Sequence, residues 1–338
     1  MLRPASGPLG DLMTTTRDLA THGGPSPQQY PFWAAVLAAG HGYSTLAISK
    51  RKRREPRVVL RPNVGLDRFL KQVSTALVAG LDFAPHDAVH GFVAGRGIVS
   101  NAAQHLSQDV VLKLDLRDFF GSVRREPLTT ALVQAGLDEP TASEVAAVVT
   151  VNGSLPQGFS TSPLLSNVAF DPTDDAIQAI AASRGATYSR YADDLTFSGT
   201  NGAVDDTLLS DVVSALEHQG WIVNPGKTRF MRRGRAQYVT GLSVDTADGP
   251  HVPRVFKQNL RREIYFATRY GISDARVRSP QPLRESQLHG WVEFLAHVEP
   301  HRRAELREAW KIIAPRPSAR RVELWDELLD DIDFPANW

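Results

Sequence analysis

An aromatic residue, a small residue and two adjacent aspartates, Tyr191-Ala192-Asp193-Asp194, constrain the fold of this chain most. The residues on both sides alternate in the manner of β-strands, which predicts that the aspartates lie at or near a tight hairpin turn. A second acidic segment follows the apolar run Val110-Val111-Leu112, so Asp115 is predicted at the end of another strand. The pattern therefore predicts a sheet that gathers three carboxylates at neighbouring strand ends.

Three such carboxylates are suited to holding two Mg²⁺ ions. Magnesium prefers hard oxygen ligands in octahedral geometry and leaves room for substrate phosphates. Two ions about 3.5–4 Å apart can activate a 3′-hydroxyl and stabilise a departing pyrophosphate. This chemistry is nucleotidyl transfer. The alternative is a solvated turn, because Asp tolerates turn conformations and hydrogen-bonds its own backbone.

Further segments stand in the order that a polymerase palm requires, which weakens that alternative. Residues 191–194 resemble the catalytic box of reverse transcriptases, and residues 113–120 resemble their first catalytic motif. Residues 155–163 resemble the motif that positions template and nucleotide, and residues 224–228 resemble the lysine-bearing loop. The resemblance covers about residues 50 to 245. It implies an α+β right-hand polymerase fold with fingers, a palm of antiparallel sheet and packed helices, and a helical thumb.

Two signatures resemble those of bacterial retron reverse transcriptases in particular. Asn101-Ala102-Ala103-Gln104-His105 resembles their Asn-Ala-x-x-His signature, and Val239-Thr240-Gly241 resembles their Val-Thr-Gly signature. Residues 90–96 also resemble the segment that precedes the first of these. Phe159-Ser160 departs from the family pattern, which has Ala-Pro there, and this change could alter template or nucleotide fit.

The catalytic roles follow from the chemistry and from the resemblance. Asp115, Asp193 and Asp194 are expected to hold two Mg²⁺ ions, for which Mn²⁺ could substitute, with the Leu116 carbonyl as a further ligand. Lys227 is suited to protonating or neutralising the leaving pyrophosphate.

The resemblance also indicates a nucleotide site. Cations must hold the triphosphate, and Arg57 with Lys52 or Arg53 matches the family positions for this, although each could equally contact template or be solvated. Phe120 stands where an aromatic ring would clash with a ribonucleotide 2′-hydroxyl and so select dNTPs; the alternative is a core phenylalanine, a role that suits Phe119 better. The remaining expected contacts are Gln157 and Gly158 to the nucleotide, and Tyr191 and Phe159 to primer and template, with a buried structural role as the alternative for Tyr191.

Charge segregation indicates a nucleic-acid partner despite a net charge of only +1. Residues 254–321 hold 15 Lys and Arg against 7 Asp and Glu. A solvated surface could explain one such block, but several blocks around a carboxylate site favour phosphate contacts. Recognition of a structured RNA is therefore assigned to Arg254, Lys257, Arg261 and Arg262 and, by resemblance, to Asn101, His105, Val239, Thr240 and Gly241. For His105 the alternative is a structural histidine in a helix.

The predicted organisation has four parts: a leader with helices (1–45), fingers (46–108), a palm (109–245) and a helical thumb (246–338). The leader up to Pro27 is expected to be loose. Strands are predicted at 46–49 and 57–60, and helices at 68–79 and near 125–135, 139–150, 160–182 and 204–219. No apolar run is long enough to predict a membrane span, and the absence of cysteine suits a reducing, cytoplasmic setting.

The resemblance implies a retron reverse transcriptase that copies part of a cognate noncoding RNA of msr-msd type into single-stranded DNA (msDNA). Synthesis would start from the 2′-hydroxyl of an internal guanosine and consume dNTPs. Such systems resemble antiphage defence modules, in which the complex restrains a separate effector protein. The alternatives are another bacterial reverse transcriptase, group II intron-like or of another defence type, and a non-catalytic RNA-binding scaffold with a polymerase fold. No oligomeric state is predicted.

Overall fold

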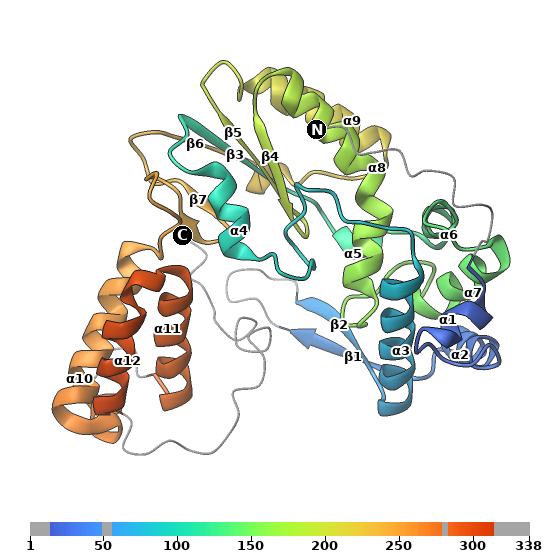
Figure 1. Ribbon diagram of the computed structural model, residues 1–338, viewed down its shortest axis with the longest axis horizontal. Coiled ribbons are helices and arrows are strands. Elements are labelled where there is room, and N and C mark those ends of the chain that lie inside the picture. Colours follow the sequence, from blue (N-terminus) through green and yellow to red (C-terminus); the bar gives the residue numbers. More distant parts are fainter. Residues whose placement is uncertain (1–13, 49–55, 279–282, 314–338) are drawn as a thin grey trace.

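A four-stranded antiparallel sheet organises the middle of the chain in the computed structural model, which describes residues 14–48, 56–278 and 283–313 (Figure 1). The strand order is β4-β5-β3-β6. The strands are β3 (Val110–Asp115), β4 (Thr187–Tyr191), β5 (Asp194–Gly199) and β6 (Arg229–Arg232). The register pairs Asp115 with Asp194 across β3 and β5, and Tyr191 with Asp194 across the β4–β5 hairpin. The predicted meeting of the acidic strand ends is therefore confirmed.

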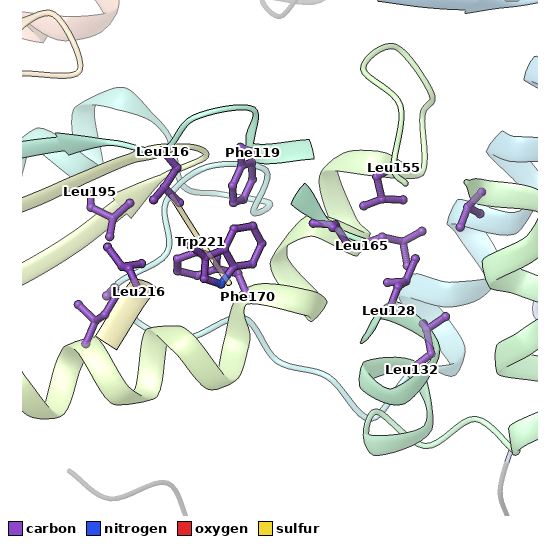
Figure 2. Packing of buried hydrophobic residues seen from close by; sticks show 14 of the residues in the cluster. Leu116, Phe119, Leu128, Leu132, Leu155, Leu165, Phe170, Leu195, Leu216 and Trp221 are labelled. Carbon is purple, nitrogen blue, oxygen red and sulfur yellow. The ribbon is translucent and has the colours of Figure 1, made fainter. Parts of the chain in front are cut away.

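One face of the sheet is covered by two long helices, α8 (Ser162–Ser183) and α9 (Asp206–His218) (Figure 1). The alternating residues Leu112, Leu114, Leu195 and Phe197 are fully buried there, in the main hydrophobic core. Phe119, Phe170 and Trp221 extend this core next to the acidic strand ends (Figure 2). The predicted helices near 160–182 and 204–219 are confirmed, including the Ser162-Pro163 start of α8, where proline is tolerated.

The opposite face of the sheet receives a short helical segment, α4 (Ile98–Ala102) and the 3₁₀ turn η1 (Ala103–His105). Because side chains alternate along a strand, Val111 points to this side, and it joins a second hydrophobic core. That core also contains Val239 and Leu242 from the two-stranded sheet of β7 (Tyr238–Val239) and β8 (Leu242–Ser243).

The N-terminal half supplies a β-hairpin and a group of helices. The hairpin consists of β1 (Tyr43–Ile48) and β2 (Arg57–Pro62), and α3 (Val64–Gly80) follows at once, capped by the Asn63 side chain. The other helices are α1 (Thr16–Thr21), α2 (Gln29–Ala38), α5 (Phe119–Ser122), α6 (Arg125–Gln134) and α7 (Glu139–Val149). The hairpin strands and the helices α3, α6 and α7 confirm the sequence predictions.

The expectation of a loose leader up to Pro27 is wrong from Thr14 onward. Thr15 and Asp18 form a reciprocal capping box at the start of α1, and the Thr14 amide donates to the Gly136 carbonyl at 2.9 Å. Leu19 is fully buried in the main core. The segment is mostly polar, so its sequence suggests a loop. The buried side chain of Leu19 and the capping box nevertheless make it a helix that packs against α3 and α7. Residues 1–13 lie outside the described residues.

The C-terminal part of the described chain is a helical bundle that stands apart from the sheet (Figure 1). It contains α10 (Arg254–Arg278), α11 (Glu285–Val298), the 3₁₀ turn η3 (Pro300–Arg302) and α12 (Arg303–Ile313). Helix α10 is interrupted at Gly271, whose φ of 75° is left-handed. Phe256, Val292 and Phe294 belong to the second core, which joins this bundle to β7 and β8. Among the described residues, no helix is both long and apolar enough to cross a membrane.

Candidate active site

The three predicted carboxylates meet at one end of the central sheet. The β4–β5 hairpin turns through Ala192 and Asp193, and Ala192 takes a left-handed φ of 54°, a strained conformation for a residue with a side chain. The Leu116 amide donates to the Asp193 carbonyl at 2.9 Å, which ties the turn to the end of β3. Asp115 and Asp194 stand opposite each other in the register. Residues almost 80 positions apart in sequence are thus neighbours.

Two lysines neutralise part of this negative charge, and a side-chain amide donates a hydrogen bond to it. Lys227, from the 3₁₀ turn η2 (Pro225–Lys227), forms an ion pair with Asp115, and Asn224 donates from Nδ2 to Asp115 Oδ1 at 3.2 Å. Lys113 Nζ lies 3.2 Å from Asp194 Oδ2. Burial, and then the nearby carboxylates of Asp194 and Asp115, raise the pKa of Asp193 to about 6. The site therefore carries an excess of negative charge that its own lysines do not fully balance.

The donor chemistry of this site fits divalent ions. Carboxylate oxygens are the ligands that Mg²⁺ and Mn²⁺ prefer, and a carboxyl whose pKa is raised by neighbouring carboxylates gains most from an added cation. In the part of the chain that the structure describes, no group of three or more acidic or histidine side chains is already gathered for a metal ion. Lys227 and Lys113 instead form ion pairs with Asp115 and Asp194.

The residues expected to bind the nucleotide are joined by direct contacts between strand β2 and the segment of Gln157 and Gly158. Arg57 Nε donates to Gln157 Oε1, and the Leu60 amide donates to the Gln157 carbonyl at 2.8 Å. Gly158 has a φ of 107°, and a Cβ there would collide with the Leu60 carbonyl. The close approach that requires this glycine is therefore to strand β2; its contact with a nucleotide stays a prediction. Lys52 and Arg53 lie outside the described residues.

The aromatic residues near the site divide between surface and core. Phe119 is 3% exposed and packs among Phe170 and Trp221, as predicted for a core phenylalanine. Phe120 is half-buried and lies beside the exposed ring of Phe92, with ring centres 6.1 Å apart. Tyr191 is also half-buried.

The expectation that Phe159 contacts primer or template is wrong for this conformation. Its side chain is 2% exposed and packs in the main core, with its ring edge against Tyr43. Its size and apolarity explain the burial, since Tyr43 on β1 and the residues of the main core enclose it.

Direct RNA recognition by the Asn-Ala-x-x-His signature is also contradicted. His105 is fully buried, and its ring nitrogens lie 2.7 Å from Ser198 Oγ and 2.6 Å from Ser189 Oγ, so it fastens η1 to β5 and β4. Burial lowers the pKa of His105 to about 3, which keeps the ring neutral. Asn101 is 1% exposed. The structural alternative stated for His105 is the one that fits.

The Val-Thr-Gly signature packs against the same segment. Val239 is fully buried in the second core, and the Thr240 hydroxyl donates to the Ile98 carbonyl at 2.9 Å. Thr240 and Gly241 have left-handed φ values of 46° and 79°. Val239 therefore offers no surface to RNA, whereas Thr240 and Gly241 are half-buried and their contact with RNA stays a prediction.

The basic residues expected to contact RNA differ in their availability. Arg254 and Arg261 are exposed on α10 and line a hollow together with Lys257 and Arg302. Lys257 Nζ is 2.9 Å from the buried carboxylate of Glu299. Arg262 is half-buried, with Nε 3.4 Å from Glu263. Arg254 and Arg261 are thus the more available cations of the four.

Sequence reasoning assigned no role to three residues that the structure brings to the site. Lys113 precedes Asp115 by two residues, so strand alternation alone places both on one face. Asn224 lies in the lysine-bearing loop and reaches Asp115. Arg190 is fully buried beneath the turn of the acidic hairpin, and no sequence signal distinguishes it from a surface arginine.

An antiparallel sheet with acidic strand ends, helices on one face and a flanking helical bundle is the arrangement of the right-hand polymerase fold. The family described as "Reverse transcriptase (RNA-dependent DNA polymerase)" matches residues 50–258, more than half of the chain. The chain belongs to this family and is of the bacterial retron type.

Similar proteins support this assignment. The Retron Mx162 reverse transcriptase of Myxococcus xanthus is 33% identical over 87% of this chain and 65% of its own length. The Retron Mx65 reverse transcriptase of the same organism is 32% identical over 78% of this chain and 70% of its own. The Retron Ec86 reverse transcriptase of Escherichia coli is 26% identical over 79% and 81%. The chain thus spans less than two thirds of the length of the first relative, 65%.

Among solved structures, a telomerase from Candida albicans in complex with a fragment of telomeric RNA aligns with a TM-score of 0.43 and 12% identity. The alignment covers 83% of this chain and 59% of the telomerase. The family assignment does not depend on this distant similarity.

Proposed function

We propose that this protein is a retron reverse transcriptase that copies part of a cognate noncoding RNA into single-stranded DNA. The observation that carries the proposal is the convergence of Asp115, Asp193 and Asp194 at one sheet end, with Lys227 and Lys113 beside them. Phosphoryl transfer depends mainly on positioning and on neutralisation of charge, and this end of the sheet supplies groups for both.

The residues of the chain take distinct parts in the proposed reaction. Asp115, Asp193 and Asp194 would hold two Mg²⁺ ions, with the Leu116 carbonyl as a further ligand. When bound, such ions supply charge neutralisation and activation of the attacking hydroxyl. Lys227 would release Asp115 and turn its ammonium group toward the leaving pyrophosphate. Arg57, held by Gln157, would grip the triphosphate, and Phe120 would exclude the 2′-hydroxyl of a ribonucleotide.

The domain boundaries belong to the proposal as well. Residues 46–108 would act as fingers, 109–245 as palm and 246–338 as thumb, with Arg254 and Arg261 directed to RNA phosphates. The proposed setting is cytoplasmic. The product would be a branched RNA–DNA hybrid of msr-msd type, primed from the 2′-hydroxyl of an internal guanosine. Its proposed role is antiphage defence, in which the complex restrains a separate effector protein.

Primer extension tests the activity. Purified protein with a primed RNA template, labelled dNTPs and Mg²⁺ should yield labelled DNA, and Asp193→Asn should yield none. Equal extension by this variant would reject the proposed site, and an inactive wild-type protein under varied Mg²⁺ and Mn²⁺ would favour an RNA-binding scaffold.

Sequencing the nucleic acid that copurifies with the protein tests the retron assignment of the product. A branched RNA–DNA molecule joined through a guanosine 2′-oxygen is the expected result. A protein-primed or untemplated DNA would instead favour another bacterial reverse transcriptase.

A further inference from the structure

A buried polar cluster lies under the catalytic turn, on the side away from the proposed metal ions. Its centre is Arg190 on β4, which is fully buried, as is its partner Asp174 on α8. Arg190 Nε is 2.9 Å from Asp174 Oδ1, and Nη2 is 2.6 Å from Asp174 Oδ2. This two-pronged pair fixes the plane of the guanidinium group. The ring of Phe170 lies 4.4 Å below it.

The remaining nitrogen of Arg190 points at the turn itself. Nη1 donates to the Ala192 carbonyl at 3.2 Å and to Asn167 Oδ1 at 3.1 Å. Ala192 is the residue with left-handed φ that directly precedes Asp193. A donor held by a buried ion pair therefore bonds the strained peptide on which the position of Asp193 depends.

A second restraint reaches the turn through Asn167. Its Nδ2 donates to the Gly91 carbonyl at 3.0 Å, and Asn167 is 2% exposed. A Cβ at Gly91 would collide with the Ala192 amide, so this segment lies directly against the turn. The segment is also fixed to β4, since the His90 amide donates to the Arg190 carbonyl at 2.8 Å. Helix α8 thus restrains the turn by two routes. Asp174 and Asn167 bind Arg190, which donates to the Ala192 carbonyl, and Asn167 also binds residue 91, which lies against the Ala192 amide.

We propose that Arg190, Asp174 and Asn167 are positioning residues that fix the catalytic turn in the conformation that binds divalent ions. The inference rests on the proposed function, because it concerns the same carboxylate site. None of the three touches substrate; they act through the Ala192 peptide and residue 91. A purely structural role would contribute stability alone, whereas a positioning role also sets the metal affinity.

The test compares metal affinity with stability in the full-length protein. Mn²⁺ binding is measured by the electron paramagnetic resonance signal of free Mn²⁺. Thermal unfolding is measured on portions of the same protein preparations to which no metal has been added. The first variant is Asn167→Ala, which removes the link between Arg190 and residue 91. The second is Gly91→Ala, whose added Cβ would collide with the Ala192 amide and so displace the turn. The control is Thr173→Val on the same helix, where the buried hydroxyl accepts from Trp221 Nε1 at 3.0 Å and has no contact with the turn.

Both test variants should bind Mn²⁺ about tenfold or more weakly, the usual effect of losing a group that orients a metal ligand. Thr173→Val should lose stability but keep the wild-type affinity. Wild-type affinity in Asn167→Ala and Gly91→Ala would overturn the proposal, as would a parallel loss of affinity in Thr173→Val. If Asn167→Ala does not fold, Gly91→Ala decides the question.

The same measurements separate this inference from the proposed function. A wild-type protein that binds no Mn²⁺ would reject the metal site and the positioning network together. A wild-type protein that binds Mn²⁺ but never extends a primer would reject the polymerase activity alone, and the affinity comparison would still decide the role of the network.

Discussion

Asp193 is the residue in which the demands of stability and of function conflict most clearly. Burial and two neighbouring carboxylates raise its pKa to about 6, so its charged form is unfavourable in the protein without metal. A residue that opposes folding yet occupies the turn of the acidic hairpin is typical of a functional site. Two predictions follow at this scale.

Replacing Asp193 with Asn should abolish primer extension and yet raise the melting temperature of the metal-free protein. The variant removes an unfavourable buried charge, which corresponds to about 1–3 kcal/mol for a pKa shift of this size. Differential scanning calorimetry without metal measures the change. Asp211→Asn, at an exposed position on α9, is the matched control and should alter neither activity nor stability. A lower melting temperature in Asp193→Asn would contradict the assigned charge repulsion.

Metal binding should weaken as the pH falls through about 6. The folded-state pKa of Asp193 lies above the ordinary aspartate value of 3.8, so as the pH falls the folded protein takes up this proton earlier than the unfolded chain does. Without metal, this group therefore costs stability above pH 6 and the cost disappears toward pH 4. A divalent ion needs the deprotonated carboxylate, so Mn²⁺ titrations at pH 5.5, 6.5 and 7.5 should show progressively tighter binding. Affinity that does not change over this range would exclude Asp193 as a ligand.

At the scale of elements, the segment of α4 and η1 carries a motif whose resemblance is clear but whose expected contact with RNA does not fit its burial. Its residues resemble a retron signature, yet His105 is inside the protein and bonds to Ser189 and Ser198 on two strands. The signature therefore fixes a helix to the face of the sheet that carries the carboxylates. Its sequence pattern alone does not distinguish a recognition motif from this structural fastening.

Replacing His105 with Ala should destabilise the protein by about 2–4 kcal/mol, because two buried hydroxyls lose their partner. Urea denaturation measures the loss, and RNA affinity of the folded variant should stay unchanged. Since burial lowers the pKa of His105 to about 3, its contribution is complete above pH 6.5 and diminishes as the pH falls from there toward 3. A stable variant with weak RNA binding would restore the recognition role. Gln104→Ala, at the neighbouring exposed position, serves as the control.

At the scale of the whole molecule, each of the two hydrophobic cores combines segments that lie far apart in the sequence. The second core joins the C-terminal helical bundle to Ala102, Val111 and Val239 of the central part. The bundle therefore packs on the elements that lie on the carboxylate-bearing face of the sheet. This arrangement connects the charge segregation in the sequence to the proposed path for RNA phosphates.

The double variant Arg254→Ala, Arg261→Ala should weaken RNA binding and make it less dependent on salt. Each phosphate contact to a single strand contributes roughly 0.7 to the slope of log affinity against log salt, so two lost contacts should reduce the slope by about 1.4. Fluorescence anisotropy between 50 and 300 mM salt measures both quantities at concentrations chosen on the order of the dissociation constant. The control Arg307→Ala removes an exposed arginine of α12 that does not line the hollow. An unchanged slope in the double variant would place the RNA elsewhere.

The sequence by itself determined the strands, the long helices and the three carboxylates. Alternation and helical periodicity are local properties, and Asp115 and Asp193 stand at strand ends that the local pattern predicts. It also indicated the core position of Phe119 beside a less buried Phe120. These features depend on residues near one another along the chain.

Tertiary structure alone decided which of the singled-out residues face solvent and which are enclosed. Phe159, His105 and Val239 proved to be interior residues because distant segments cover them. The same is true of Arg190, whose buried pairing with Asp174 depends on α8 lying beneath β4. Burial is a property of the surroundings, which are assembled from segments far apart in sequence, and so no local pattern could have fixed it.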